Sequence, residues 1–155
     1  MSHPPLELTY VLVPIDFSPT SVDALAYGRA LAARCGARVE LLHVVDAAAL
    51  DGVLGHAAPE VWQEALAQAR RKLGELAQGD PFTVLEGSPP DVIVDHADAV
   101  NADMIVMGSL GRTGLQRLLV GSVAERVVRA AHCPVLVVRH GTGPARSSDV
   151  GDSAG

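Results

Sequence analysis

The sequence predicts an α/β fold, a single domain in which an open sheet of five parallel strands carries helices on both faces. Three observations support this prediction. The chain has 155 residues, the usual size of one domain. Short apolar segments alternate along it with longer segments of helical periodicity, as they do when helices connect parallel strands. Four of the five strand segments are almost entirely apolar, which is typical of strands covered on both faces.

The expected strands are short apolar runs bounded by turn residues. They cover residues 10–13, 39–45, 82–86, 104–107 and 135–138. The first helix is expected to begin with Ser18 as its cap and Pro19 as its first residue, and to end near Cys35, before Gly36.

Further helices are expected after Pro59, after Pro90 and from Ser122. Residues 46–58 form a polar connection, rich in Gly and Ala, that is longer than most loops of compact domains. We interpret this connection as a mobile segment or a lid.

Apolar spacings of three and four residues predict which helix faces lie against the sheet. For the first helix the predicted inner residues are Val22, Leu25, Gly28, Leu31 and Cys35. For the helix that begins at Ser122 they are Val123, Val127, Val128 and Ala131.

The charge balance argues against several functions. Twelve basic and 18 acidic side chains give a net charge of −6 without any basic stretch, so neither nucleic acid nor an anionic membrane is an expected partner. No apolar run approaches the ~20 residues of a membrane helix, and the first residues do not resemble a signal peptide. We therefore expect a soluble, cytoplasmic protein with an N-terminal extension at 1–7, a domain at 8–140 and a disordered tail at 141–155.

The cysteines and histidines give no metal or redox motif. Cys35 and Cys133 are too few for a disulfide framework and have no zinc-site spacing, so we expect two reduced, buried thiols. None of the six histidines has a helical i, i+4 partner or joins a cluster of metal-ligand spacing. Hydrogen-bonded or exposed structural roles are expected for them, and the residues that would ligate a metal stay unknown.

The strongest candidate site is a glycine-spaced segment between the fourth strand and the last helix. Gly108 and Gly111 would let the backbone turn sharply and approach a ligand, and Gly121 would clear the backbone again before Ser122. The start of a helix favours an anion such as phosphate, and Arg112 would add positive charge. Two alternatives stay open: an ordinary tight turn at Gly108 and Gly111, and a capping box from Ser122 to Glu125.

Residues at the end of the first strand are the second candidate set. Asp16 follows the strand, where its carboxylate would accept hydrogen bonds from a sugar or would form an Asx turn into the first helix. Pro14, Ile15 and Val44 would give a base an apolar wall and backbone groups, or would be plain core. The two sets share one crevice only if the first and fourth strands are neighbours, which the residues alone do not establish.

Five segments in this order resemble the universal stress protein family. They are Val-Pro-Ile-Asp at 13–16, Leu-Leu-His-Val-Val at 41–45, Gly-Ser-Leu-Gly-Arg-Thr-Gly at 108–114, and Gly-Ser-Val-Ala-Glu-Arg-Val at 121–127 with Cys-Pro-Val-Leu-Val-Val at 133–138. The pattern G-x2-G-x9-G-[ST] is complete and resembles that of the ATP-binding branch of the family.

This resemblance implies a Rossmann-like sheet with strand order 3-2-1-4-5 and an ATP site with Mg²⁺ or Mn²⁺. Asp16 would approach the ribose and Val44 the adenine, while Gly108, Gly111, Gly121 and Ser122 would hold ribose and phosphates. The expected set of ATP-binding residues is completed by Pro14, Ile15, Met107, Arg112 and Val123. Members commonly dimerise through the last strand, so a homodimer through Val135 to Val138 is expected.

The implied function is nucleotide-dependent regulation in a stress response. A weak ATPase and a sensor of another adenine nucleotide, such as AMP, stay open as alternatives. Catalysis is disfavoured because the sequence offers no Walker lysine, no G-x-S-x-G nucleophile motif and no placed general base, so no catalytic residue is assigned. A phosphoacceptor receiver domain is disfavoured because the third strand ends in Glu86-Gly87-Ser88, without an acceptor Asp.

Overall fold

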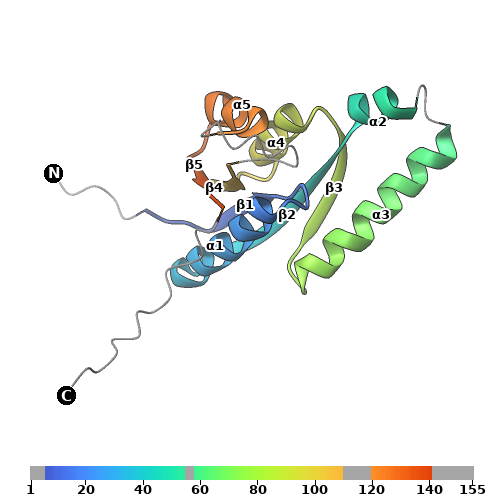
Figure 1. The fold of residues 1–155 in the computed structure, drawn as a ribbon. Coiled ribbons are helices and arrows are strands. Elements are labelled where there is room, and N and C mark those ends of the chain that lie inside the picture. Colours follow the sequence, from blue (N-terminus) through green and yellow to red (C-terminus); the bar gives the residue numbers. More distant parts are fainter. Residues whose placement is uncertain (1–5, 55–57, 110–119, 141–155) are drawn as a thin grey trace, which may run out of the picture.

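The computed structural model describes residues 6–54, 58–109 and 120–140, which form a layered α/β fold around one sheet (Figure 1). The elements in chain order are β1 (Tyr10–Pro14), α1 (Pro19–Cys35), β2 (Arg38–Asp46), α2 (Ala47–Leu54), α3 (Pro59–Ala77), β3 (Phe82–Gly87), α4 (Pro89–Ala99), β4 (Met104–Gly108), α5 (Ser122–Ala130) and β5 (Val135–Val138). Among the helices within these ranges, none has the length and apolar character to cross a membrane.

The sheet has the order β3-β2-β1-β4-β5, and every neighbouring pair is parallel. The predicted fold class and strand order are therefore confirmed. β1 lies between β2 and β4, so the direction of strand addition reverses at this strand. In such sheets the crevice at the carboxyl ends of the strands around the reversal is the usual place for a ligand.

The helices cover both faces of the sheet, as Figure 1 shows: α1 and α3 lie on one side, and α4 and α5 lie on the other. Neighbouring residues of β1 point to opposite faces, because side chains alternate along a strand. Val13 packs with Leu25 of α1 and Leu73 of α3, whereas Leu12 packs with Ile93 of α4 and Val127 of α5. Each face thus has its own apolar core.

The local signals at the ends of α1 act as predicted. The hydroxyl of Ser18 accepts a hydrogen bond of 3.3 Å from the N–H of Ser21, and Pro19 stands in the first turn. Gly36 ends the helix with φ of 70°, a conformation that glycine adopts without strain.

The predicted inner face of α1 is partly wrong. Val22 is 40% exposed and Cys35 is exposed, so the expectation of two buried thiols fails for Cys35. The buried positions are instead Thr20, Ser21, Ala24, Leu25, Gly28 and Ala32. Most of them are small because α1 lies very close to the sheet: a Cβ built on Gly28 would stand 3.0 Å from Cγ2 of Val13. Close approach, rather than apolar character, selects this face.

Two further predictions need correction. Val128 of α5 is 50% exposed, because Ala124 and Val127 are the residues of that helix that face the sheet. The expected connection at 46–58 contains the helix α2, and residues 55–57 lie outside the described ranges. Three consecutive alanines begin α2, and Oδ1 of Asp46 accepts a hydrogen bond of 3.1 Å from the N–H of Ala49. Alanine's high helix propensity and this capping bond explain the helix.

Candidate functional site

The strands that precede the two predicted candidate sets are neighbours in the sheet. β1 pairs directly with β4, with Val11 opposite Met104 and Leu12 opposite Ile105. Because the strands are parallel, Asp16 after β1 and Ser109 after β4 follow the same edge of the sheet. The adjacency that the residues alone left open is therefore present.

Asp16 forms the Asx turn that was one of its two interpretations. Its Oδ1 accepts a hydrogen bond of 2.9 Å from the N–H of Ser18 and a second bond from the Ser18 hydroxyl. Both recorded bonds use the same carboxylate oxygen, and the side chain is half-buried. The turn fixes where the second oxygen, Oδ2, lies relative to the strand end.

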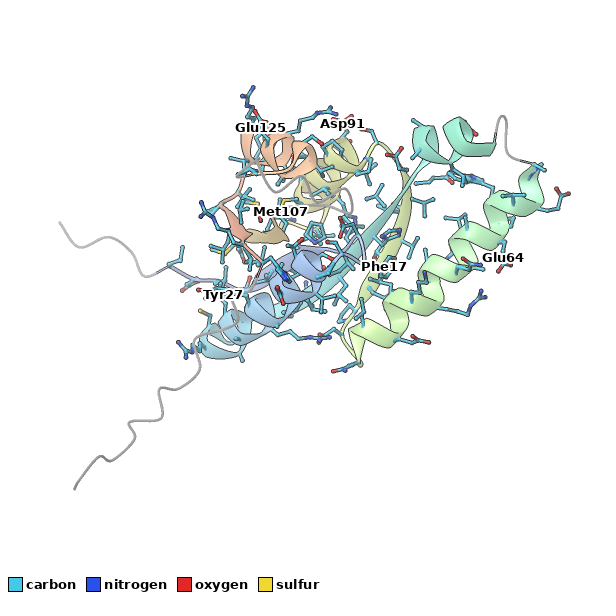
Figure 2. The ribbon with its side chains drawn as sticks, viewed as in Figure 1. Phe17, Tyr27, Glu64, Asp91, Met107 and Glu125 are labelled. Carbon is cyan, nitrogen blue, oxygen red and sulfur yellow. The ribbon has the colours of Figure 1, made fainter. Side chains whose placement is uncertain are left out.

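The backbone on either side of Asp16 is held from β2 and α3. Nδ1 of His43 lies 2.6 Å from the carbonyl oxygen of Ile15, and since a carbonyl can only accept, Nδ1 carries the proton. Phe17 has φ of 65°, which is rare for a bulky residue, and its ring centroid lies 4.6 Å from that of His43. Nζ of Lys72 stands 5.7 Å from the Phe17 ring, which Figure 2 labels. These contacts keep the turn in one place.

Pro14 and Ile15 are buried, and their side chains belong to the core rather than to an open surface. The N–H of Ile15 donates to the carbonyl of Leu42 at 2.7 Å, so both backbone groups of Ile15 have partners within the protein. Met107 is also buried, at 5% exposure, and Val44 is half-buried against the α4 and α5 side of the sheet.

Gly108 is a glycine for a reason that the sequence did not reveal. A Cβ at this position would stand 2.8 Å from the carbonyl carbon of Thr20 and 3.0 Å from the nitrogen of Ser21. The missing side chain therefore makes room for the start of α1. Gly111 and Arg112 lie outside the described residues.

The two described ends of the glycine-spaced segment touch each other. Ser109 is 3% exposed, and its N–H donates to the carbonyl of Val138 at 2.9 Å. Its carbonyl accepts a hydrogen bond from the N–H of Gly121. The end of β4, the end of β5 and the start of α5 are thereby tied together.

The capping box proposed for Ser122 is wrong. Gly121 is the N-cap, with φ of −67° and ψ of 161°, no side chain caps the helix, and Ser122 is its exposed first residue. The first helical hydrogen bond runs from the N–H of Glu125 to the carbonyl of Gly121, at 2.9 Å. The N–H groups of residues 122–124 precede this bond and so point out of the helix end.

A cleft of about 420 Å³ opens beside the start of α5. Its walls come from the end of β2, the end of β3 and the first turns of α2, α4 and α5. The lining residues are Asp46, Ala47, Ala48, Gly87, Ser88, Pro89, Pro90, Ser122, Val123 and Arg126. Three helix N-termini and mainly small or apolar side chains thus surround one space, which suits an anionic ligand with an apolar part.

Ser122 and Val123 are the predicted site residues that line this cleft, and Arg126 is a residue that the sequence analysis missed. Its signal was available: Arg126 stands four residues after Ser122, on the same side of a helix. Its guanidinium lies 3.0 Å from Oδ1 of Asp91, in the first turn of α4. A second hollow, about 350 Å³ and lined by Arg29 and Asp80 among others, lies at the opposite edge of the sheet.

A buried polar network attaches α4 to the sheet. Glu40 of β2 is 5% exposed, and its carboxylate accepts hydrogen bonds from the hydroxyls of Tyr10 and Thr83 and from Nε2 of His96 on α4. Burial alone would raise the pKa of Glu40, but these hydrogen bonds outweigh it and hold the pKa below its usual value. Burial, and then the bond to Glu40 and its charge, raise the pKa of Tyr10 to about 12.

These features define a Rossmann-like α/β protein with a ligand-sized cleft at the carboxyl edge of its sheet. A model described as the universal stress protein family matches residues 9–139. The chain therefore belongs to the universal stress protein family, as its motifs predicted.

Curated and solved relatives agree with this assignment. Universal stress protein MJ0531 of Methanocaldococcus jannaschii is 38% identical over 137 residues, which are 83% of this chain and 81% of that protein. The solved structure of hypothetical protein MJ0577, from the same organism, has a TM-score of 0.78 at 30% identity and covers 89% of this chain and 100% of its own.

Two solved relatives are complexes with adenine nucleotides. A universal stress protein in complex with cAMP has a TM-score of 0.58 at 25% identity, over 86% of this chain and 98% of that one. The universal stress protein from Archaeoglobus fulgidus in complex with dAMP has a TM-score of 0.53 at 26% identity, over 84% and 97%.

Proposed function

We propose that this protein binds ATP at the carboxyl edge of its sheet and acts as a nucleotide-dependent regulatory protein in a stress response. The main support for the proposal is the cleft that is lined by the starts of α2, α4 and α5. Helix starts present N–H groups and the positive ends of helix dipoles, both of which favour phosphate. The relatives in complex with cAMP and dAMP support an adenine nucleotide as the ligand.

The phosphates are proposed to lie at the start of α5, on the N–H groups that follow Gly121. The backbone of Gly121 has ordinary extended angles, so its lack of a side chain is not needed for its conformation. Glycine is favourable at an N-cap, and the absence of a side chain there would also leave space for a phosphate at the start of α5. Gly108, Gly111 and Arg112 stay in the proposed loop by resemblance alone.

The ribose and the base are proposed to lie nearer to β1 and β2. Oδ2 of Asp16 would accept a hydrogen bond from a ribose hydroxyl, because Oδ1 already holds the turn. The base would lie beside Val44 and the small side chains at the starts of α2 and α4, with Pro14, Ile15 and Met107 supporting the wall from the core.

A divalent cation is proposed to arrive with the nucleotide rather than in a site of its own. Among the described residues, no group of three or more His, Cys, Asp or Glu side chains is arranged to hold a metal. Asp46 of the cleft lining has one oxygen on the start of α2, Asp91 has one on Arg126, and Asp16 after β1 has one in its turn. Such a donor set fits Mg²⁺ or Mn²⁺ held mainly by phosphates and water.

We propose that the protein binds the nucleotide without catalysing a reaction, and that it forms a homodimer that responds to the bound nucleotide. β5 is the last strand in the sheet order, and its residues Val135 to Val138 are apolar, so pairing with a second copy would cover its outer edge. The bond from Ser109 to Val138 links this strand to the proposed loop. A cytoplasmic location is part of the proposal, supported by two free thiols.

The test is titration calorimetry of the purified protein with ATP, AMP and cAMP in the presence of Mg²⁺. We expect ATP to bind most tightly. Gly121→Val should weaken ATP binding at least tenfold, because its side chain would occupy phosphate space, while circular dichroism stays unchanged. Val128→Ala, on the exposed side of the same helix and outside the cleft, is the matched control and should bind normally.

Three results would contradict the proposal. Absence of ATP binding to the unaltered protein would refute the function. Tighter binding of AMP than of ATP would favour a monophosphate sensor. Normal ATP binding by a folded Gly121→Val variant would refute the proposed position of the phosphates at the start of α5.

A further inference from the structure

Arg126 lies within the segment 121–127 that resembles the family, but it is not among the predicted binding residues. It lines the cleft together with Ser122 and Val123, and of the described residues around that cleft it is the only basic one. It lies one helical turn beyond Ser122, and helical side chains lean toward the N-terminus of their helix. Its guanidinium is therefore directed toward the end of α5 where an anion is favoured.

The present partner of Arg126 is Asp91, on the first turn of the neighbouring helix. The two helix starts lie close together, and Figure 2 labels Asp91 on α4 and Glu125 on α5. The contact from Nη2 to Oδ1 is 3.0 Å, and the two side chains are 58% and 63% exposed. An ion pair this exposed contributes little to stability, because water screens it and two long side chains must be ordered. Arg126 can therefore change partners at small cost.

A phosphate group is the stronger partner for this guanidinium. It carries more negative charge than one carboxylate, and the planar fork of arginine matches two phosphate oxygens at once. Asp91 and a bound phosphate would compete for the same cation. Asp91 thus holds Arg126 at the edge of the cleft and would at the same time oppose the binding of a phosphate to its guanidinium.

We propose that Arg126 is a phosphate-binding residue of this cleft and that Asp91 competes with the bound phosphate for it. The inference rests on the proposed nucleotide site and adds to it a residue and a regulating contact. It predicts that loss of the Arg126 charge weakens ATP binding, whereas loss of the Asp91 charge strengthens it. A purely structural ion pair would respond to the loss of either partner in the same direction.

The experiment measures ATP affinity by titration calorimetry, with Mg²⁺, for Arg126→Gln, Asp91→Asn and the double variant. Arg126→Gln should weaken ATP binding about five- to tenfold, with a smaller dependence on salt. Asp91→Asn should strengthen ATP binding about two- to fivefold. In the double variant the gain from Asp91→Asn should vanish, because the competed cation is gone.

The same helix supplies a matched control. Arg129 forms an exposed pair with Glu125 at 2.7 Å, has the same charge as Arg126, and lies outside the cleft lining. Arg129→Gln and Glu125→Gln repeat the two charge changes without touching the cleft, and both should leave ATP affinity within twofold of the unaltered protein.

The possible failures are distinguishable. If the unaltered protein does not bind ATP, the proposed function and this inference both fall. If it binds ATP and Arg126→Gln behaves like Arg129→Gln, the nucleotide site stands and the role of Arg126 is refuted. Weaker ATP binding by a folded Asp91→Asn variant would overturn the competition.

Discussion

Gly108→Ala tests whether this glycine serves the packing of α1 rather than a ligand alone. The added methyl group would stand 2.8 Å from the carbonyl carbon of Thr20, 2.9 Å from its Oγ1 and 3.0 Å from the nitrogen of Ser21. Two of these atoms are backbone. They belong to the first turn of α1, which the Ser18 cap and the Asp16 turn hold in place. The contact can be relieved only by moving α1 away from β4.

The expected loss is about 2 kcal/mol of unfolding free energy. Forcing one extra methyl group into a packed site costs about 1–3 kcal/mol, and contact with backbone places this case in the upper half of that range. The smaller entropy of the unfolded chain with alanine offsets about 0.4–1 kcal/mol. For a chain of this size, each kcal/mol lowers the melting temperature by about 2–4 °C.

The assay is urea denaturation without nucleotide, so that a change in ligand binding does not enter the result. Gly52→Ala is the matched control. A Cβ on Gly52 meets nothing within 4 Å, and alanine within a helix should stabilise the protein by about 0.5–1 kcal/mol. The same chemical change therefore has opposite signs at the two glycines. A Gly108→Ala variant as stable as the unaltered protein would refute the packing argument.

The buried network around Glu40 gives two further predictions. Because the folded-state pKa of Glu40 is lowered, the ionised carboxylate stabilises the fold above the ordinary pKa of 4.5, and this stability is lost as pH falls through the folded value. Glu40→Gln should therefore lower the free energy of unfolding by about 2 kcal/mol near neutral pH and by progressively less in acid, as measured by urea denaturation across pH. An unchanged difference between the two proteins in acid would contradict this. Because the pKa of Tyr10 is raised from 10.0 to about 12, the stability that its neutral hydroxyl contributes is complete below pH 10 and is lost toward pH 12. In a Tyr27→Phe background, tyrosinate absorbance should therefore rise near pH 12. Ionisation of Tyr10 near pH 10 would show that the network is absent.

The sheet was predictable because its signals are local and repeated. A strand buried on both faces must be apolar along its whole length, and Leu12 and Val13 show the reason, since each faces a separate core. The caps of α1 were predictable because Ser18, Pro19 and Gly36 act through their own backbone. The strand order came from the motifs of a family and is confirmed in the structure.

The errors share a different cause, which is contact between segments that are distant in the chain. The face of α1 was misassigned because its closest contacts, from Gly28 to Val13 and from Thr20 to Gly108, favour small residues over apolar ones. The network of Glu40 was not predicted because its partners come from β1, β3 and α4. Arg126 was missed although it stands one helical turn after Ser122, because its contact with Asp91 depends on the packing of α4 beside α5.

Local sequence signals and contacts between distant segments also account for different parts of the candidate site. In a parallel sheet, every helix that follows a strand begins at the carboxyl edge, so the convergence of α2, α4 and α5 on one cleft is a property of the fold. That arrangement favours an anion without choosing among anions. Under the proposed function, selectivity would come from side chains placed by tertiary contacts, such as Arg126 held by Asp91.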